Sequence, residues 1–393
     1  MQQTWRWFGP RDKVSLADAR QAGVEGIVTA LHDVPLGEVW PLEAIRERQE
    51  MVRAAGMEWT VVESLDVSER IKLREPGFGR DIENYVASLR NVAACGIRVV
   101  AYNLMPVFSW MRTELAYELP TGATATRFDA TSFAAFDLFV LQRKGAEEEW
   151  GEARCRAAHE LYEAMTEPER QRMVATILQG LPGGNGSFSL EEVRLGLDRY
   201  RDVDVAGFRA NAAEFLRAVC PVAEELGVRM CVHPDDPPRA LLGLPRIVST
   251  TDDLAFLIEQ WPGEANGITF CTGALGVRAD NDLGKMVRRF ANRIWFAHLR
   301  STARDGDGVG FSEAAHLEGN ADLVDIVMAL VLEERQRSKG GDSRPLPFRA
   351  DHGQQLLNDR ERDAQAGYPA IGRLRGLAEL RGVMRACERL LPA

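Results

Sequence analysis

The sequence predicts an α/β fold in which eight parallel strands, each associated with a helix, close into a barrel. Short runs of β-branched and aromatic residues recur along the chain, and each is followed by a segment with apolar residues at helical spacing. No change in composition marks a linker, so we expect a single domain over residues 1–393. An open, doubly wound sheet is the alternative fold.

Eight segments have the character of strands and eight have the character of helices. The expected strands are Thr4–Phe8, Gly26–Leu31, Glu58–Ser64, Arg98–Asn103, Val228–His233, Gly267–Cys271, Arg293–Leu299 and Leu346–His352. The expected helices are Ser15–Ala22, Leu42–Ala55, Arg80–Cys95, Phe208–Leu226, Thr251–Trp261, Asn281–Asn292, Ala321–Arg335 and Ile371–Leu390. Ser15 and Thr251 are expected to be N-caps. Gly56 and Gly96 stand where glycines that end helices belong.

One stretch does not fit the repeat, because more than a hundred residues separate Asn103 from Val228. We expect an insertion at about 112–204 that forms a lid or an oligomer contact. Arg143–Met165 and Ser189–Tyr200 have helical character. Leu119–Thr131 and Gly180–Ser187 are rich in Gly, Thr and Pro and are expected to be mobile loops over the active-site face.

Composition and charge argue against several kinds of partner. The formal net charge is -10, which repels phosphate backbones and argues against nucleic acid. Six scattered cysteines without a CxxC pair are typical of reduced thiols. No segment resembles a secretion leader or a membrane span, so we expect a cytoplasmic protein with no membrane partner.

Polar residues stand at the ends of the expected strands, where a barrel of this kind has its active site. The residues at these ends are His32, Asp33, Glu63, Ser64, Asn103, His233, Cys271, His298, Asp351 and His352. Four of the six histidines occupy such positions, which favours one converging site over independent structural residues. His159 and His316 lie elsewhere and are expected to have surface or helix-packing roles.

His233, Cys271, His298 and Asp351 follow the last four strands and suit a divalent transition metal. Thiolate and imidazole donors by themselves favour zinc, whereas manganese or ferrous iron would need open positions for water and substrate. Asp235 and Asp236 would either orient His233 or cap local turns. Each ligand candidate alone would more often be an ordinary core residue, and the set carries the interpretation.

Several motifs resemble those of the mannonate dehydratases. The segments HPDDPP (233–238), ITFCTG (268–273), FAHLR (296–300) and RADHG (349–353) are similar to the metal-site segments of that family. WRWFG (5–9) and YNLMPVF (102–108) match as well, and the similarity extends to residue 382. The segment between Arg112 and Asp204 is longer than in the shorter family members.

The resemblance implies a xylose-isomerase-like barrel and a hydro-lyase that converts D-mannonate to 2-keto-3-deoxy-D-gluconate and water in hexuronate breakdown. It implies Mn²⁺ or Fe²⁺ in place of zinc, with His233, Cys271, His298 and Asp351 as the ligands. It also implies that His352 and Tyr368 transfer protons, with the acid and base roles left open, and that the chain forms a homo-oligomer.

Arg6, Asn103 and Arg300 are candidates for binding the substrate, because guanidinium and amide groups match carboxylate and hydroxyl oxygens. Ordinary ion pairing is the alternative for the two arginines. Two other functions remain open from the residues alone. One is a metal-dependent aldose–ketose isomerase, and the other is a barrel with a structural metal whose surface binds a partner.

Overall fold

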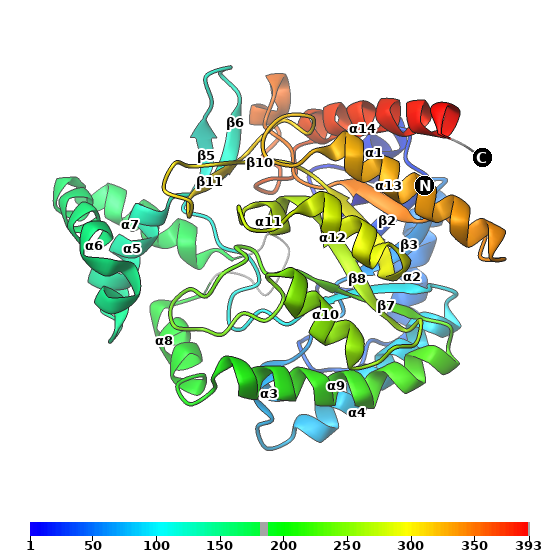
Figure 1. Ribbon diagram of the computed structural model, residues 1–393, viewed down its shortest axis with the longest axis horizontal. Helices are drawn as coiled ribbons and strands as arrows, with labels where there is room; N and C mark the ends of the chain where they lie inside the picture. Colours follow the sequence, from blue (N-terminus) through cyan, green and yellow to red (C-terminus); the bar gives the residue numbers. More distant parts are fainter. Residues whose placement is uncertain (181–187, 392–393) are drawn as a thin grey trace.

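Eight parallel strands close into a barrel in the computed structural model, which describes residues 1–180 and 188–391 (Figure 1). In spatial order the strands are β1 (Gln2–Arg6), β12 (Pro347–Ala350), β9 (Ile294–Leu299), β8 (Asn266–Cys271), β7 (Arg229–His233), β4 (Val99–Asn103), β3 (Glu58–Glu63) and β2 (Gly26–Thr29). Every neighbouring pair is parallel. The predicted barrel is confirmed, and the open sheet is wrong.

Helices follow the strands and cover the barrel. They are α1 (Leu16–Gln21), α2 (Leu42–Ala54), α4 (Phe78–Ala94), α9 (Val205–Glu225), α10 (Thr251–Glu259), α12 (Leu283–Phe290), α13 (Leu323–Lys339) and α14 (Ala370–Leu390), with the short helices α3 (Glu69–Leu73) and α11 (Thr272–Gly276) between them. The barrel interior is filled by Val28, Val61, Ala101, Cys231, Trp295 and Phe296. The larger core lies between the strands and the helices.

Local signals at the ends of the helices were mostly predicted correctly. Ser15 caps α1 by accepting a hydrogen bond from the Asp18 amide. Gly56 and Gly96 adopt positive φ angles after α2 and α4, as expected of glycines that end helices. The cap of α10 is Thr250 and not Thr251, because the Thr250 side chain and the Asp253 carboxylate form a capping box.

Four strands, β1, β2, β3 and β12, end earlier than predicted, and the changes in β1 and β12 affect the site. β1 ends at Arg6 because the Phe8 amide donates to the Asp12 carboxylate and the chain turns away from the barrel. β12 ends at Ala350, so Asp351 and His352 belong to the loop that follows it. This loop gives the two side chains directions that strict alternation along a strand would not give.

The insertion after β4 contains a hairpin and several helices. Its elements are β5 (Glu114–Glu118), β6 (Thr124–Phe128), α5 (Ala130–Ala135), the π-helical turn η1 (Phe136–Leu141), α6 (Ala146–Ala164), α7 (Glu167–Leu178) and α8 (Leu190–Arg199). The helices predicted over Arg143–Met165 and Ser189–Tyr200 correspond to α6 and α8. The loop expected at Leu119–Thr131 is wrong, because Thr124–Phe128 pairs as a strand. The predicted loop Gly180–Ser187 lies, except for Gly180, outside the described residues.

A second, four-stranded sheet joins the insertion to the loop after β9. Its order is β10 (Thr302–Arg304), β11 (Phe311–Glu313), β6 and β5, all antiparallel. We call it the accessory sheet. Phe128 of β6 and Phe311 of β11 stack at 5.8 Å between ring centroids, within a separate apolar cluster. In Figure 1, β5, β6, β10 and β11 lie between the barrel and α5, α6 and α7, which stand to one side.

The described part of the chain contains no helix that is both long enough and apolar enough to cross a membrane.

Contacts at the start of α14 hold the loop after β12 in place. The buried Asp359 carboxylate accepts hydrogen bonds from the amides of Ala370, Ile371 and Gly372 at 2.9–3.0 Å. These amides have no partner within the helix, so the carboxylate satisfies them and complements the positive helix end. Gly372 then lies so close to the loop that a Cβ atom would be 1.9 Å from the Gln354 carbonyl oxygen.

We predict that Gly372→Ala destabilises the protein by about 1–3 kcal/mol, because the added methyl group has no space against the backbone. Gly382→Ala, on the same helix, is the matched control, because a Cβ there would meet no atom within 4 Å. The control should stabilise the protein by up to about 1 kcal/mol through helix propensity. Thermal unfolding of both variants measures the difference, and equal shifts would contradict the packing argument.

Candidate active site and metal centre

Donor atoms from adjacent strands meet at the C-terminal mouth of the barrel. His233 at the end of β7, Cys271 at the end of β8 and His298 on β9 each place one donor atom within 4.8 Å of the others. Asp351 reaches the same group through Oδ2, which lies 3.8 Å from Cys271 Sγ and 3.7 Å from His298 Nδ1. Strand register produces this convergence, because Cys271 pairs directly with His298 across β8 and β9.

Burial sets the protonation of the donors. Desolvation lowers the pKa of His233 and lowers that of His298 to about 4, so both rings are neutral at pH 7. Burial also raises the pKa of the Cys271 thiol to about 12. Although burial opposes it, the Arg349 guanidinium holds the pKa of Asp351 well below its usual range. The carboxylate and the two imidazoles are therefore already in the forms that bind metals.

The four residues fit a divalent cation. His233 Nδ1 lies 2.7 Å from the Pro234 carbonyl oxygen, to which it can only donate, so Nε2 keeps its lone pair. That Nε2 faces His298 Nδ1 at 3.2 Å. His298 Nε2 is buried without a hydrogen-bond partner among the described residues, 3.4 Å from Glu63 Oε1. Imidazole, thiolate and carboxylate donors that face one another form a set suited to a transition metal.

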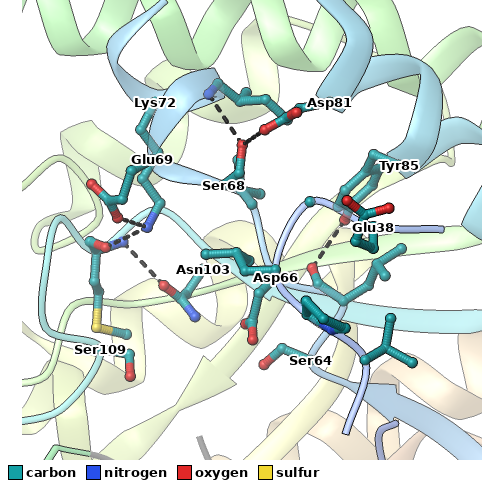
Figure 2. Close-up of a pocket in the computed structure, with 18 of the residues that line it drawn as sticks. Glu38, Ser64, Asp66, Ser68, Glu69, Lys72, Asp81, Tyr85, Asn103 and Ser109 are labelled. Carbon is teal, nitrogen blue, oxygen red and sulfur yellow. Dashed lines mark hydrogen bonds and ion pairs between the residues drawn. The ribbon is translucent and has the colours of Figure 1, made fainter. Parts of the chain in front are cut away.

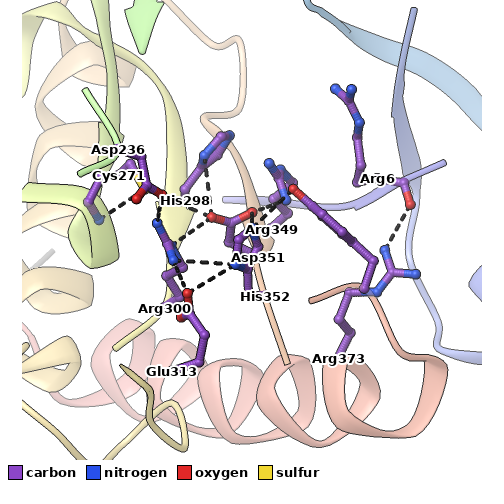
Figure 3. Close-up of polar contacts among 12 residues, drawn as sticks. Arg6, Asp236, Cys271, His298, Arg300, Glu313, Arg349, Asp351, His352 and Arg373 are labelled. Atoms are coloured by element: carbon purple, nitrogen blue, oxygen red, sulfur yellow. Dashed lines mark hydrogen bonds and ion pairs between the residues drawn. The ribbon is translucent and has the colours of Figure 1, made fainter. Parts of the chain in front are cut away.

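Buried ion pairs surround these donors in one continuous series, of which Figure 3 shows the part around Asp236, Arg300, Glu313, Arg349 and Asp351. Arginines alternate with carboxylates in the order Arg6, Glu63, Arg349, Asp351, Arg300, Glu313, Arg112 and Asp236, and Asp236 closes back on Arg300. We call these eight residues the ion network. Four guanidinium groups balance four carboxylates, which offsets the large cost of removing each charge from water.

His352 and Tyr368 form a buried pair beside the donors. His352 Nε2 lies 3.2 Å from the Tyr368 hydroxyl oxygen. The ring of Phe8 packs edge-on against Tyr368 with centroids 4.8 Å apart, and Trp110 lies against His352 at 6.0 Å. Burial, together with Asp351, raises the pKa of Tyr368 to about 12, so the phenol keeps its proton at neutral pH. The pair is suited to exchanging protons in a site largely closed to water.

A pocket of about 410 Å³ lies beside the ion network, over the ends of β1 to β4 (Figure 2). Arg6 and Asn103, two of the predicted substrate-binding residues, line it. Asp66 also lines it and, within the described part of the chain, makes no hydrogen bond or ion pair. Arg300 is not among the described lining residues, and its guanidinium is engaged by Asp236, Glu313 and Asp351.

Other polar residues singled out from the sequence have local roles. Asp235 accepts hydrogen bonds from the Val248 amide and the Ser249 hydroxyl at 2.8 Å, so it braces its own loop. Asp236 joins the ion network instead. His316 packs on Gly376 of α14, where a Cβ would lie 2.1 Å from the ring, in agreement with the helix-packing interpretation. His159 lies against Phe139 in the insertion.

Several residues around the site were not assigned a role from the sequence. Glu63 stands at a strand end and Arg349 lies inside the RADHG motif, so both carried a usable signal. Arg112 and Glu313 carried none, because neither lies at the end of a barrel strand. Glu313 reaches the site only because the accessory sheet packs over the mouth of the barrel.

Comparison with known proteins finds one family over nearly the whole chain. The model of the family described as D-mannonate dehydratase (UxuA) matches residues 1–391. The chain is 52% identical over 390 residues to a mannonate dehydratase of Chromohalobacter salexigens, with 99% of this chain and 100% of that protein covered. A crystal structure of mannonate dehydratase from Streptococcus suis serotype 2 is 32% identical, with a TM-score of 0.77 and coverage of 99% and 94% of the two chains.

A xylose isomerase domain protein from Alicyclobacillus acidocaldarius is similar in fold alone, with 14% identity, a TM-score of 0.52 and 99% coverage of both chains. This likeness agrees with the xylose-isomerase-like barrel that the sequence predicts. The family match covers residues 1–391, and the relative from Chromohalobacter salexigens is 52% identical over its full length. The chain belongs to the D-mannonate dehydratase family.

Proposed function

We propose that the protein is a metal-dependent hydro-lyase that converts D-mannonate to 2-keto-3-deoxy-D-gluconate and water. The observation that carries this proposal is the convergence of His233, Cys271 and His298 beside the hydrogen-bonded pair of His352 and Tyr368. Full-length similarity to the family supports the same reaction. Loss of water from a sugar acid requires removal of the hydrogen at C2 and departure of the hydroxyl at C3, and both steps need proton transfer.

His233, Cys271, His298 and Asp351 would hold the metal ion. Resemblance to the family favours Mn²⁺ or Fe²⁺, whereas the donor types alone favour zinc. When bound, a divalent ion supplies stabilisation of the negative charge that develops beside the substrate carboxylate. His233, Cys271 and His298 lie on three adjacent strands of the closed barrel, and Asp351 directly follows the neighbouring strand β12, which keeps their positions fixed relative to one another.

The charge of the site supports an anionic substrate. The ion network is balanced, with four positive and four negative groups. The ion network, a divalent cation and the Cys271 thiolate together would carry one excess positive charge. A sugar acid brings one carboxylate, which would neutralise this charge, whereas a neutral sugar would leave it uncompensated. This argument favours a dehydratase of sugar acids over an isomerase of neutral sugars.

The substrate would extend from the donors into the pocket beside them. Arg6 belongs to the ion network and also lines the pocket, so it can bind a carboxylate or hydroxyl oxygen at the junction. The side-chain oxygen of Asn103, Oδ1, already accepts a hydrogen bond from the Met105 amide at 3.2 Å. Its NH₂ group is available to donate to a substrate hydroxyl. Arg300 would act mainly by keeping Asp351 and Glu313 ionised.

His352 and Tyr368 would move the protons. One of them takes the C2 proton as that C–H bond breaks, and the electron pair forms the C2–C3 double bond. The other gives a proton to the C3 hydroxyl, which leaves as water. Their mutual hydrogen bond lets the proton pass between them afterwards, and the enol becomes the 2-keto acid when a proton moves from its oxygen to C3.

One prediction of the proposed reaction concerns the metal ion. Chelator-treated protein should convert D-mannonate to a 2-keto-3-deoxy acid only after Mn²⁺ or Fe²⁺ is restored. D-gluconate, which differs in configuration at C2, and a neutral aldose are the matched control substrates. Absence of product from D-mannonate with Mn²⁺, Fe²⁺ and Zn²⁺ alike, together with conversion of the neutral sugar, would favour the isomerase instead.

Another prediction tests whether Cys271 is a metal ligand or an ordinary buried cysteine. Cys271→Ala should lower the affinity for Mn²⁺ by more than about 10²-fold, because the loss of a direct ligand exceeds that of an outer partner. Cys231→Ala is the control, because this thiol is equally buried and faces the Val100 carbonyl at 3.7 Å inside the barrel. Metal content after dialysis measures both, and equal retention would remove Cys271 from the ligand set.

A further prediction concerns the hydroxyl group of Tyr368. Tyr368→Phe should lower kcat by about 10²–10⁴-fold, because proton transfer through the hydroxyl is lost, while bound metal stays at the wild-type level. Tyr102→Phe is the control, because this hydroxyl is buried without a hydrogen-bond partner among the described residues. Wild-type turnover in Tyr368→Phe would exclude the phenol from the reaction.

A further inference from the structure

The accessory sheet delivers a carboxylate to the histidine of the proton-transfer pair. Glu313 is the last residue of β11, which pairs with β10 on one side and β6 on the other. Its side chain is buried, and its Oε1 atom lies 3.1 Å from His352 Nδ1. The contact therefore joins the accessory sheet to the loop after β12, the loop that contains Asp351 and His352.

The charge on Glu313 is fixed by two arginines. Its Oε1 atom lies 3.1 Å from Arg112 Nη2 and also accepts from Arg300. Although burial opposes it, the Arg300 guanidinium, with His352 and Arg112, lowers the pKa of Glu313 to about 2. An ionised carboxylate can only accept hydrogen bonds, so the atom facing it at 3.1 Å must be a donor.

The donor is the Nδ1–H group of His352. Arg300 Nη1 also lies near Nδ1, at 3.3 Å, but a guanidinium cannot accept, and it already donates to the same Glu313 oxygen. Three donors, from Arg112, Arg300 and His352, then converge on the Oε1 atom of Glu313. A neutral imidazole carries a single N–H, so Nε2 then has no proton and accepts from the Tyr368 hydroxyl at 3.2 Å.

We propose that Glu313 is a positioning residue that holds His352 in its Nδ1–H form and aims Nε2 at the reacting carbon. This inference rests on the proposed dehydration, because it assigns the proton-accepting atom of that reaction. Glu313 itself does not touch the substrate; it acts through the histidine, as an orienting carboxylate does elsewhere for an imidazole base. The accessory sheet is then part of the catalytic apparatus and not only a cover for the barrel.

Asp236 provides a matched control for Glu313. It is equally buried and contacts the same two arginines, at 2.8 Å from Arg112 and 2.5 Å from Arg300. No hydrogen bond joins it to His352 in the described part of the chain. Glu313→Gln and Asp236→Asn therefore each remove one negative charge from the same arginines, and only the first removes the contact with the imidazole.

The kinetic test compares the two variants on D-mannonate and on D-mannonate deuterated at C2. Glu313→Gln should lower kcat by at least about 10²-fold and raise the isotope effect on kcat, because proton removal becomes rate-limiting. Asp236→Asn should change KM more than kcat and leave the isotope effect near the wild-type value. Equal losses of kcat with equal isotope effects in the two variants would overturn the proposal.

A spectroscopic test does not depend on turnover. Protein labelled with ¹⁵N in its six histidines and loaded with diamagnetic Zn²⁺ reports which ring nitrogen of His352 carries the proton, with His352→Asn to identify its signals. The proton should be on Nδ1 in the wild type and in Asp236→Asn, and should shift toward Nε2 in Glu313→Gln. A wild-type protein protonated on Nε2 would overturn the inference, whereas absence of D-mannonate turnover alone would overturn only the proposed reaction.

Discussion

The ion network at the mouth of the barrel is the constraint on which the site depends. Eight charged side chains are removed from water there, and each would be very costly to bury alone. Alternation of arginine and carboxylate makes the burial tolerable, because every charge has a partner of opposite sign. The same alternation fixes the positions of the side chains, since moving one would leave its neighbour unpaired.

The network also joins parts of the chain that would otherwise be independent. Arg6, Glu63 and Arg349 come from strands of the barrel, whereas Arg112 and Glu313 come from the insertion and the accessory sheet. The accessory sheet packs on its own apolar core, which is separate from that of the barrel. Apolar packing alone would therefore not determine the orientation of the sheet relative to the mouth of the barrel. Directional contacts between arginines and carboxylates fix that orientation, and they place a carboxylate against His352.

Exclusion of water determines the protonation states of the side chains in the site. Burial keeps His298 and His233 neutral and Tyr368 protonated, so the side chains are in the forms that a donor set and a proton-transfer pair require. In such surroundings the interactions between charges are strong, so the charge of a bound substrate matters more than in water. A balanced network that would gain one positive charge with its ion is suited to a singly charged sugar acid.

The sequence alone determined the eight-stranded barrel and the residues at its strand ends, because strands and helices have local periodicities that a short window reveals. His233, Cys271 and His298 followed from that register, and Tyr368 from family motifs. The hairpin Glu114–Phe128 was missed although β5 and β6 pair locally, because the Gly, Thr and Pro content of its second half indicated a loop. Tertiary structure alone decided the partners of Arg112 and Glu313, 201 residues apart, because no local pattern encodes which buried charges will meet.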